Sequence, residues 1–422
     1  GTLLGFVLYL LFAFCFNDIF KRKLALLLAA FGGGIGVWVY PLLEPFYRGL
    51  EIATHMPIDL TMGEPFIFNS TYYSSHYIAS LTLFVLIILF TLLAIQNKRL
   101  LYGLYAGLCG LVLANFHPFT YAIIAFVFVA YQIFLLIKEK KSGIWFLKYL
   151  LVFGFVSSPS IFYHLYMLAT PWWQNQMWNS MTEAPDVIFI VFGFGLLLLF
   201  SVLTVYKSLR KEVNIKFESF LMIWLLAQMS LIFLPTSIQR RFLEGYQIIL
   251  VILSVCSLDY FLKKRSWLLK GRIFPATIFF LCFSLSLFLV VIFDFYNFYH
   301  RIGTMYIFSE HYVAMKELKK ITGPDEIIIA DLVSANMIPG LALRRVFVGH
   351  GVETINAEKK IRELTIFAKT NNDQVRKEII KRYNIKYLFY DPGWNWGFDP
   401  NEKEYLEQVY EKGGYKVYKV KI

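Results

Sequence analysis

Long apolar runs separated by short polar segments dominate residues 1–299 of the chain. Because the hydrocarbon core of a bilayer is about 30 Å thick, a helix that crosses it needs about 20 mostly apolar residues. The runs predict about ten spans, of which the first begins inside an apolar run and the fourth is short. These spans are residues 1–16, 24–43, 73–95, 101–115, 119–137, 144–168, 185–206, 217–235, 246–262 and 273–293. The pattern therefore predicts a polytopic α-helical membrane domain over residues 1–299, with part of the N-terminus absent.

The fourth predicted span ends at Asn115, directly before Phe116, His117 and Pro118. Proline lacks the amide N–H that a helix interior needs and clashes with the preceding turn, so an uninterrupted helix is excluded here. We expect the fourth and fifth spans to form a tight hairpin or a broken pair of helices.

Composition and charge support the same class of protein. The chain is 58% hydrophobic and 17% charged, which is too apolar for a soluble protein of its length. Of the 21 Lys and Arg residues before residue 300, 18 fall in five alternate loops, residues 17–23, 96–100, 138–148, 206–216 and 263–272. Since cytoplasmic loops carry the excess of Lys and Arg, the alternation predicts that these loops face the cytoplasm. Topology thus explains the basic residues, and nucleic acid is not an expected partner.

The sequence changes to a charged, mixed composition after about residue 300. Apolar strand-like runs alternate there with amphipathic helical segments, and the last two runs are joined at Gly413 and Gly414. This order predicts a soluble α/β domain over residues 300–422, with a mainly parallel sheet and a final hairpin. The charge alternation places this domain outside the cytoplasm.

Arg240 and Arg241, in the stretch "SIQRRFLEGY", lie on the predicted outward face, where the only other cation before residue 300 is Arg48. Guanidinium groups bind phosphate through two parallel hydrogen bonds, so an anion site is one interpretation. A membrane-interface anchor that pairs with Glu244 three or four residues later is the other. We favour the anion site, with Glu244 holding the arginines in place.

His117 lies at the outward helix break, where freed backbone groups can line a cavity. A histidine there can contact a phosphate or act as an acid–base group near neutral pH. A buried histidine that is hydrogen-bonded to a neighbouring helix would have the same sequence context.

The long outward loop, residues 41–77, is expected to carry interfacial helices. Its Asp59 and Glu64 are candidates for a general base or a metal ligand, and His55 and His76 lie near them in sequence. No spacing here matches a known metal motif, so no metal ligand is assigned. Asp59 is kept as a weak catalytic candidate beside its alternative as a solvated loop residue.

Two further segments offer contacts to a sugar or an acceptor. Trp172 and Trp173 combine with amides on the outward side, where they would stack on sugar rings or form an interfacial aromatic belt. His350 stands between two glycines directly after a predicted strand, where ligands gather in doubly wound sheets. A turn that docks the tail onto the membrane domain is the alternative there.

The arrangement of many spans, "PTSIQRRFLEGY" before a late span, and an outward tail with "RRVFVGHGVET" and "IKYLFYDPG" resembles the GT-C class of integral-membrane glycosyltransferases. The similarity is greatest to the prokaryotic branch related to dolichyl-phosphate-mannose protein mannosyltransferases. Members of this class transfer a sugar from a polyprenyl-phosphate carrier to an acceptor on the outer side of the membrane. An acidic residue in their first outward loop commonly acts as base or metal ligand.

The resemblance implies that Arg240 and Arg241, with His117, contact the phosphate of a polyprenyl-phosphate-linked sugar. It implies a glycan, lipid or protein acceptor and a divalent cation as the candidate cofactor. The expected location is the plasma membrane of a prokaryote, and the expected catalytic base lies upstream of Gly1. A transporter or flippase of lipid-linked material, or a non-catalytic envelope assembly protein, remains the alternative.

Overall fold

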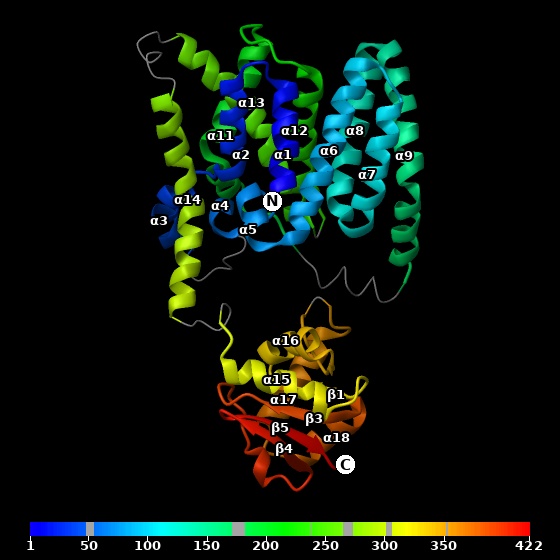
Figure 1. Cartoon of the computed structure of the whole chain (residues 1–422), viewed down its shortest axis with the longest axis vertical. Helices are drawn as coiled ribbons and strands as arrows, with labels where there is room; N and C mark the ends of the chain where they lie inside the picture. Colours follow the sequence, from blue (N-terminus) through cyan, green and yellow to red (C-terminus); the bar gives the residue numbers. More distant parts are fainter. Residues whose placement is uncertain (48–54, 171–181, 237, 265–272, 301–305, 352) are drawn as a thin grey trace. The chain divides into compact units, whose positions relative to one another are not determined.

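The computed structural model describes the chain except residues 48–54, 171–181, 237, 265–272, 301–305 and 352. The chain forms two compact units (Figure 1). Unit 1 comprises Gly1–Leu168 and Met181–Asp294, and unit 2 comprises Ala169–Ser180 and Phe295–Ile422. Each unit has its own hydrophobic core.

Unit 1 is helical throughout its described secondary structure. Its helices are α1 (Thr2–Cys15), α2 (Ile19–Phe31), α3 (Gly36–Tyr47), α4 (Ile58–Thr61), α5 (Ile67–Tyr73), α6 (Ser75–Asn97), α7 (Leu101–Phe116), α8 (Pro118–Lys138), α9 (Lys140–Leu168), α11 (Val187–Leu209), α12 (Glu218–Ile232), the short 3-10 helix η1 (Gln239–Leu243), α13 (Tyr246–Lys264) and α14 (Ile273–Tyr299). By length and composition, six helical stretches in the described part of the chain are able to cross a membrane, and others, such as α1, α7 and α12, are apolar but shorter. The fold is thus that of a polytopic membrane protein.

One predicted span lies within a stretch able to cross a membrane, Ile19–Tyr47, but is divided between two helices. The stretch 24–43 was expected as a single helix, but α2 ends at Phe31 and α3 begins at Gly36. The freed amide of Ile35 donates to the carbonyl of Phe192 in α11 at 3.0 Å. The breaks in two different helices therefore satisfy each other's backbone groups, as a helix break inside a membrane domain requires.

Glycine makes this close approach possible. The helix α11 is itself kinked at Gly195, which has φ +50°. A Cβ atom added to Gly34 would lie 1.9 Å from the carbonyl oxygen of Gly193. Since no side chain fits at that distance, the two backbones can touch only where residue 34 is glycine.

The connections of unit 1 fall into two sets. Figure 1 shows the α1–α2, α6–α7, α8–α9 and α11–α12 connections at one end, which we call the basic end because four of the five Lys- and Arg-rich loops lie there. The α7–α8 connection lies at the opposite end, and η1 packs against α8 there. Helices α7 and α8 are separated only by His117, so they are the predicted broken pair.

Unit 2 is an α/β fold with a five-stranded sheet in the order β2-β1-β3-β5-β4. Its elements are α15 (Ser309–Ile321), β1 (Ile327–Ile329), α16 (Leu332–Ala342), β2 (Arg345–Val346), α17 (Ala357–Lys369), α18 (Asp373–Tyr383), β3 (Ile385–Tyr390), the 3-10 helix η3 (Pro400–Glu402), β4 (Leu406–Lys412) and β5 (Tyr415–Val420). Strands β2, β1 and β3 pair in parallel, and β5 pairs antiparallel with both β3 and β4. The parallel strands are joined by helices, as such crossovers require.

Alternate residues of the strands face two separate cores. Ile329, Leu388 and Tyr418 pack with α17 and α18 in one core. Their neighbours Ile328 and Phe389 pack with α15 and α16 in the other. Successive strand residues point to opposite faces. The sheet is therefore covered by helices on both sides, and its strand ends are left for loops.

Candidate functional site

The arginine pair lies in η1, at the end of unit 1 opposite the basic end. The backbone amide of Arg240 donates to the carbonyl of Thr182 at 3.0 Å, which fixes the start of this turn. Its side chain forms an ion pair with Glu64, with Nη2 3.1 Å from Oε1. Glu64 is nearly fully buried, at 4% exposed. The outward loop and the arginine pair thus meet, although they are far apart in sequence.

Arg241 has a different set of partners. Its Nη1 donates to the hydroxyl of Tyr77 in α6 at 3.3 Å. Its guanidinium lies 5.3 Å from the ring centre of Phe119 in α8, within the range of a cation–π contact. Helices α6 and α8 therefore position Arg241, whereas the loop before α5 positions Arg240.

Both arginines keep an unused donor. The Nε atoms of Arg240 and Arg241 are buried, and neither has a hydrogen-bond partner among the residues that the structure describes. A buried donor without a partner carries a free-energy penalty of about 1–3 kcal/mol. An oxyanion that accepts from both Nε atoms would remove this penalty and would face two guanidinium charges.

Glu244 does not pair with the arginines, which corrects the role expected for it. Its carboxylate accepts hydrogen bonds from Ser80 and, at 2.6 Å, from Thr120. Nδ1 of His117 lies 3.2 Å from the same carboxylate. Glu244 is fully buried, so these contacts from α6 and α8 replace the water that an exposed carboxylate would have. It fixes the helices around the arginines and does not touch the arginines' side chains.

His117 is unsuited to be a cationic phosphate contact. Burial, followed by the nearby charges of His76 and Arg241, lowers the pKa of His117 to about 3. The ring is therefore neutral near pH 7, and its contact with the Glu244 carboxyl group is not that of an imidazolium ion. Nδ1 also lies 2.6 Å from the Thr120 hydroxyl. The alternative of a buried, hydrogen-bonded histidine describes this residue.

Several residues around the arginines carry no local sequence signal. Ser80 and Thr120 lie in apolar helices, where a single hydroxyl residue is common and does not by itself indicate a function. Gln228 of α12 donates to the backbone carbonyls of Phe242 at 3.0 Å and Glu244 at 2.7 Å, and so holds the turn that carries the arginines. Glu64 was a candidate by its loop, but its pairing with Arg240 follows only from the tertiary structure.

Asp59 stabilises the break between α2 and α3. Its Oδ2 accepts from the amides of Gly34 at 3.2 Å and Gly36 at 3.1 Å, in the break between α2 and α3. Burial raises the pKa of Asp59 to about 7, against the opposing hydrogen bonds from Ser286 and the two glycine amides. The carboxyl caps a helix break, and no described contact joins it to the arginine pair.

The predicted contacts to a sugar or an acceptor lie outside the described part of unit 1. Trp172 and Trp173 lie outside the described residues. His350 belongs to unit 2, where it is exposed in the turn that follows β2. Its carbonyl accepts from the amides of Glu353 at 3.1 Å and Thr354 at 3.0 Å.

No metal centre is formed by the described residues. Among them, no group of three or more His, Cys, Asp or Glu side chains is arranged to hold a metal ion. The described side chains therefore do not form a site that fits a divalent cation.

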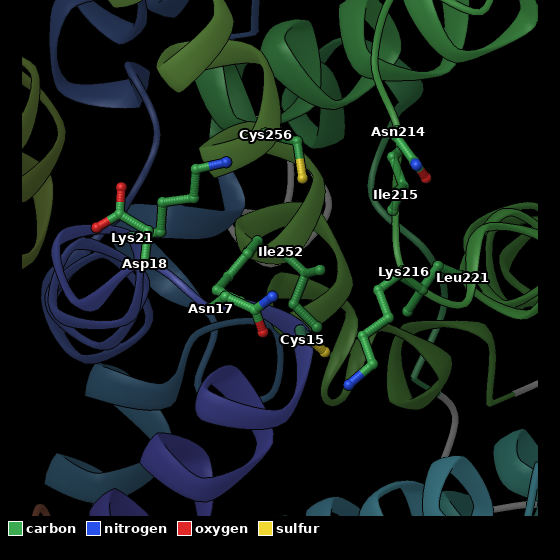
Figure 2. Close-up of a pocket in the computed structure, with 11 residues that line it drawn as sticks. Cys15, Asn17, Asp18, Lys21, Asn214, Ile215, Lys216, Leu221, Ile252 and Cys256 are labelled. Carbon is green, nitrogen blue, oxygen red and sulfur yellow. The ribbon is translucent and has the colours of Figure 1, made fainter. Parts of the chain in front are cut away.

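A cavity of about 470 Å³ lies at the basic end of unit 1. Figure 2 shows Lys21 on one side of it and Asn214 and Lys216 on the other. The ammonium of Lys216 donates to the carbonyl of Phe14 at 2.8 Å, so it joins the end of α1 to the segment before α12. No residue predicted for the functional site lines this cavity.

Comparison with known proteins rests on structure. No family model matches the chain, and no curated protein matches it. The structure is similar to the crystal structure of the Archaeoglobus fulgidus oligosaccharyltransferase in complex with Zn and sulfate, with a TM-score of 0.51 and 14% sequence identity. The match covers 93% of this chain and 55% of that chain. The apo form of the same protein gives a TM-score of 0.47 at 14% identity, covering 93% and 57%.

The chain thus spans about half the length of the solved oligosaccharyltransferase. At 14% identity the likeness concerns the fold. It supports the GT-C-like fold expected from the sequence, whereas the mannosyltransferase branch stays a prediction.

Proposed function

We propose that the protein is a membrane glycosyltransferase that transfers a sugar from a polyprenyl-phosphate donor to an acceptor at the arginine-pair end of unit 1. The observation that carries this proposal is the pair of buried Nε donors on Arg240 and Arg241, which lack a partner among the described residues. The GT-C-like fold supports the reaction class. Phosphate is the ligand that best uses two adjacent guanidinium groups.

The two arginines would act on the leaving group. In the transfer, the bond between the anomeric carbon and a phosphate oxygen breaks, and the electron pair stays on that oxygen. The acceptor's nucleophilic atom forms the new bond to the anomeric carbon and loses its proton to a general base. Guanidinium donors aimed at the phosphate stabilise the charge that develops on it. Arg240 and Arg241 are the residues to which we assign this role.

The surrounding residues would keep the arginines in place. Glu64 orients Arg240 through their 3.1 Å ion pair, and Tyr77 orients Arg241. The ion pair also offsets one of the two positive charges, so the site would favour an anion of low charge. Phe119 adds an apolar surface beside Arg241, which suits the start of a polyprenyl chain.

The orientation of the chain follows the charge distribution. We propose that the basic end faces the cytoplasm and that the arginine pair, with the soluble domain of residues 300–422, lies outside it. The plasma membrane of a prokaryote is the proposed location. The acceptor would be a glycan, a lipid or a protein in the envelope.

Binding of the lipid product tests the proposal without knowledge of the sugar. The full chain in detergent micelles would be titrated with polyprenyl phosphate and, separately, with the uncharged polyprenol. We expect tighter binding of the phosphate. Arg240→Gln and Arg241→Gln should each weaken this binding about tenfold or more, because each removes a charge-assisted contact. Arg210→Gln, at the exposed C-terminal end of α11, makes the same charge change at the basic end and should have little effect.

Turnover separates the enzyme from a transporter. Membranes that contain the protein would be supplied with polyprenyl-phosphate sugars and envelope acceptors, and new glycosidic products would be measured by mass spectrometry. We expect product from the wild type and about a hundredfold less from either arginine variant. Equal binding of polyprenol and polyprenyl phosphate would contradict the assignment of Arg240 and Arg241 as a phosphate-binding site. Movement of the lipid across the bilayer without a product would overturn the reaction.

A further inference from the structure

Unit 2 contains a pocket of about 460 Å³ beside its edge strand β2. This volume lies in the range of small-ligand sites, about 300–1,000 Å³. We call it the β2 pocket. Its walls include Asn336 of α16, Arg345 of β2, His350 and Thr354 of the following turn, and Lys360 of α17.

The charged side chains that line the pocket are mostly basic: Arg344, Arg345 and Lys360 against Glu353. Arg344 also lines it, but its guanidinium is engaged by backbone atoms: Nε donates to the carbonyl of Thr322 at 3.0 Å, and Nη2 donates to that of Lys319 at 2.6 Å. Among the described residues, the one ion pair of Arg345 is an exposed contact with Asp325 at 3.6 Å. Exposed pairs of this kind are weak, so Arg345 remains available to a ligand.

Lys360 is the side chain that most favours an anionic ligand in this pocket. It is half-buried, and its ammonium has no ion pair and no hydrogen bond with the described residues. Its Nζ lies 5.9 Å from the ring centre of Phe347, at the outer limit of a cation–π contact. Burial lowers the pKa of Lys360, against the opposing charge of Glu363. An oxyanion beside the ammonium would replace the water that burial removes.

The start of α17 adds a second source of positive potential. Its N-cap residue, Asn356, has φ +55°, and its side chain makes no capping hydrogen bond. The first-turn amides of this 13-residue helix therefore lack a side-chain acceptor, and the helix dipole places partial positive charge there. Ile355 and Lys360, which flank this turn, both line the pocket.

We propose that the β2 pocket binds a small molecule that carries a phosphate or carboxylate group, in the size class of a sugar phosphate or a uronic acid. Lys360 and Arg345 would supply the charge, and the Thr354 hydroxyl and the Asn336 amide would supply polar contacts to the rest of the molecule. This site is independent of the arginine pair and goes beyond the proposed transfer reaction.

Calorimetry on the full chain in detergent micelles tests the site with three probes: glucose 6-phosphate, glucuronate and glucose. The proposal expects at least one of the two anions to bind about tenfold or more tightly than glucose. Lys360→Gln should reduce that affinity about tenfold, and Lys360→Arg should retain most of it. Comparison of the two anions tells whether phosphate or carboxylate is the preferred group.

Lys359→Gln provides the matched control. Lys359 precedes Lys360 in α17, is exposed and does not line the pocket, so the variant makes the same change in net charge. Its affinity should stay within about twofold of the wild type. Equal losses in the two glutamine variants would overturn the site in favour of a general electrostatic effect. Binding of neither anion, or equal binding of glucose, would also overturn it. Unchanged unfolding of unit 2 in Lys360→Gln shows that lost affinity is not lost folding.

Discussion

The carboxylate of Glu244 lies 3.2 Å from Nδ1 of His117, and the hydroxyl of Thr120 lies 2.6 Å from both groups. This contact joins the turn between η1 and α13 to the break between α7 and α8. All three side chains are buried, so protein atoms must satisfy their donors and acceptors. The turn that contains the arginine pair is thus held in place by a buried polar network of Glu244, His117 and Thr120.

Removing this carboxylate should destabilise unit 1. In Glu244→Ala, the buried hydroxyls of Ser80 and Thr120 lose their carboxylate partner and keep only the Tyr77 carbonyl and the His117 ring, and each lost contact costs about 1–3 kcal/mol. We expect the free energy of unfolding to fall by a few kcal/mol in total, measured by denaturant titration in mixed micelles. The exposed Glu183→Ala should stay within about 0.5 kcal/mol of the wild type. Equal stability of the two variants would contradict the structural role of Glu244.

A side chain at Gly36 should be incompatible with the helix break. Its Cβ would lie 2.1 Å from Oδ1 of Asp59 and 2.5 Å from Cβ of Pro57. We expect Gly36→Ala to lower the free energy of unfolding by about 1–3 kcal/mol or to prevent folding, because overpacked sites must shift their neighbours. Gly154→Ala in α9 is the control, since an added Cβ meets no atom within 4 Å there. Comparable yield and thermal stability of the two variants would show that the break is not tightly packed.

Stability should depend on pH through Asp59. Burial raises its pKa from the ordinary 3.8 to about 7, so the folded state holds a proton that the unfolded state releases above pH 4. The contribution to stability is therefore largest below about pH 4, is lost as pH rises towards 7, and is constant above that. The loss should amount to a few kcal/mol. Unfolding titrations between pH 4.5 and 8 should show this slope in the wild type and a reduced one in Asp59→Asn. An unchanged slope in the variant would assign it to other groups.

The stability of unit 2 should depend on the buried side chain of Arg376. Arg376 is 1% exposed; its Nε donates to the carbonyl of Phe367 at 2.9 Å, and its Nη1 pairs with Asp373 at 2.5 Å. Arg376→Ala leaves the Phe367 carbonyl without this donor, while Asp373 keeps Lys403 and Tyr405, and we expect a loss of about 1–3 kcal/mol. Hydrogen exchange of the β3 amides in the full chain would measure it. The exposed Arg362→Ala on α17 should leave this exchange nearly unchanged, and similar exchange in both variants would count against the role of Arg376.

Much of the helical layout could be predicted because apolar length alone determines it. The expected span 119–137 is observed as Pro118–Lys138, and the helix and strand alternation of the tail coincides with the elements of unit 2. The break between α2 and α3 could not be predicted, since Gly32–Gly34 lie inside an apolar run that is long enough to cross a membrane. The break depends on Phe192 and Asp59, which are distant in sequence.

The candidate site could be predicted only in part, because most of its contacts join residues that are distant in sequence. Arg240 and Arg241 contrast with their surroundings, so sequence alone singles them out. Their partners come from α6, α8 and the loop before α5, and no local pattern connects Glu64 or Tyr77 with them. Local reasoning paired Glu244 with the arginines because it is nearby in sequence. The side chain instead turns towards Ser80 and Thr120, which are buried hydroxyls on other helices.

The contact between Ile35 and Phe192 imposes an order on biosynthesis. The amide of Ile35 finds its acceptor in a helix that the ribosome makes much later. At about 5–20 residues per second, the delay is on the order of ten seconds. Until α11 emerges, the first two helices hold a peptide group that lipid cannot satisfy. The break between α2 and α3 therefore takes its final form only after α11 has been made.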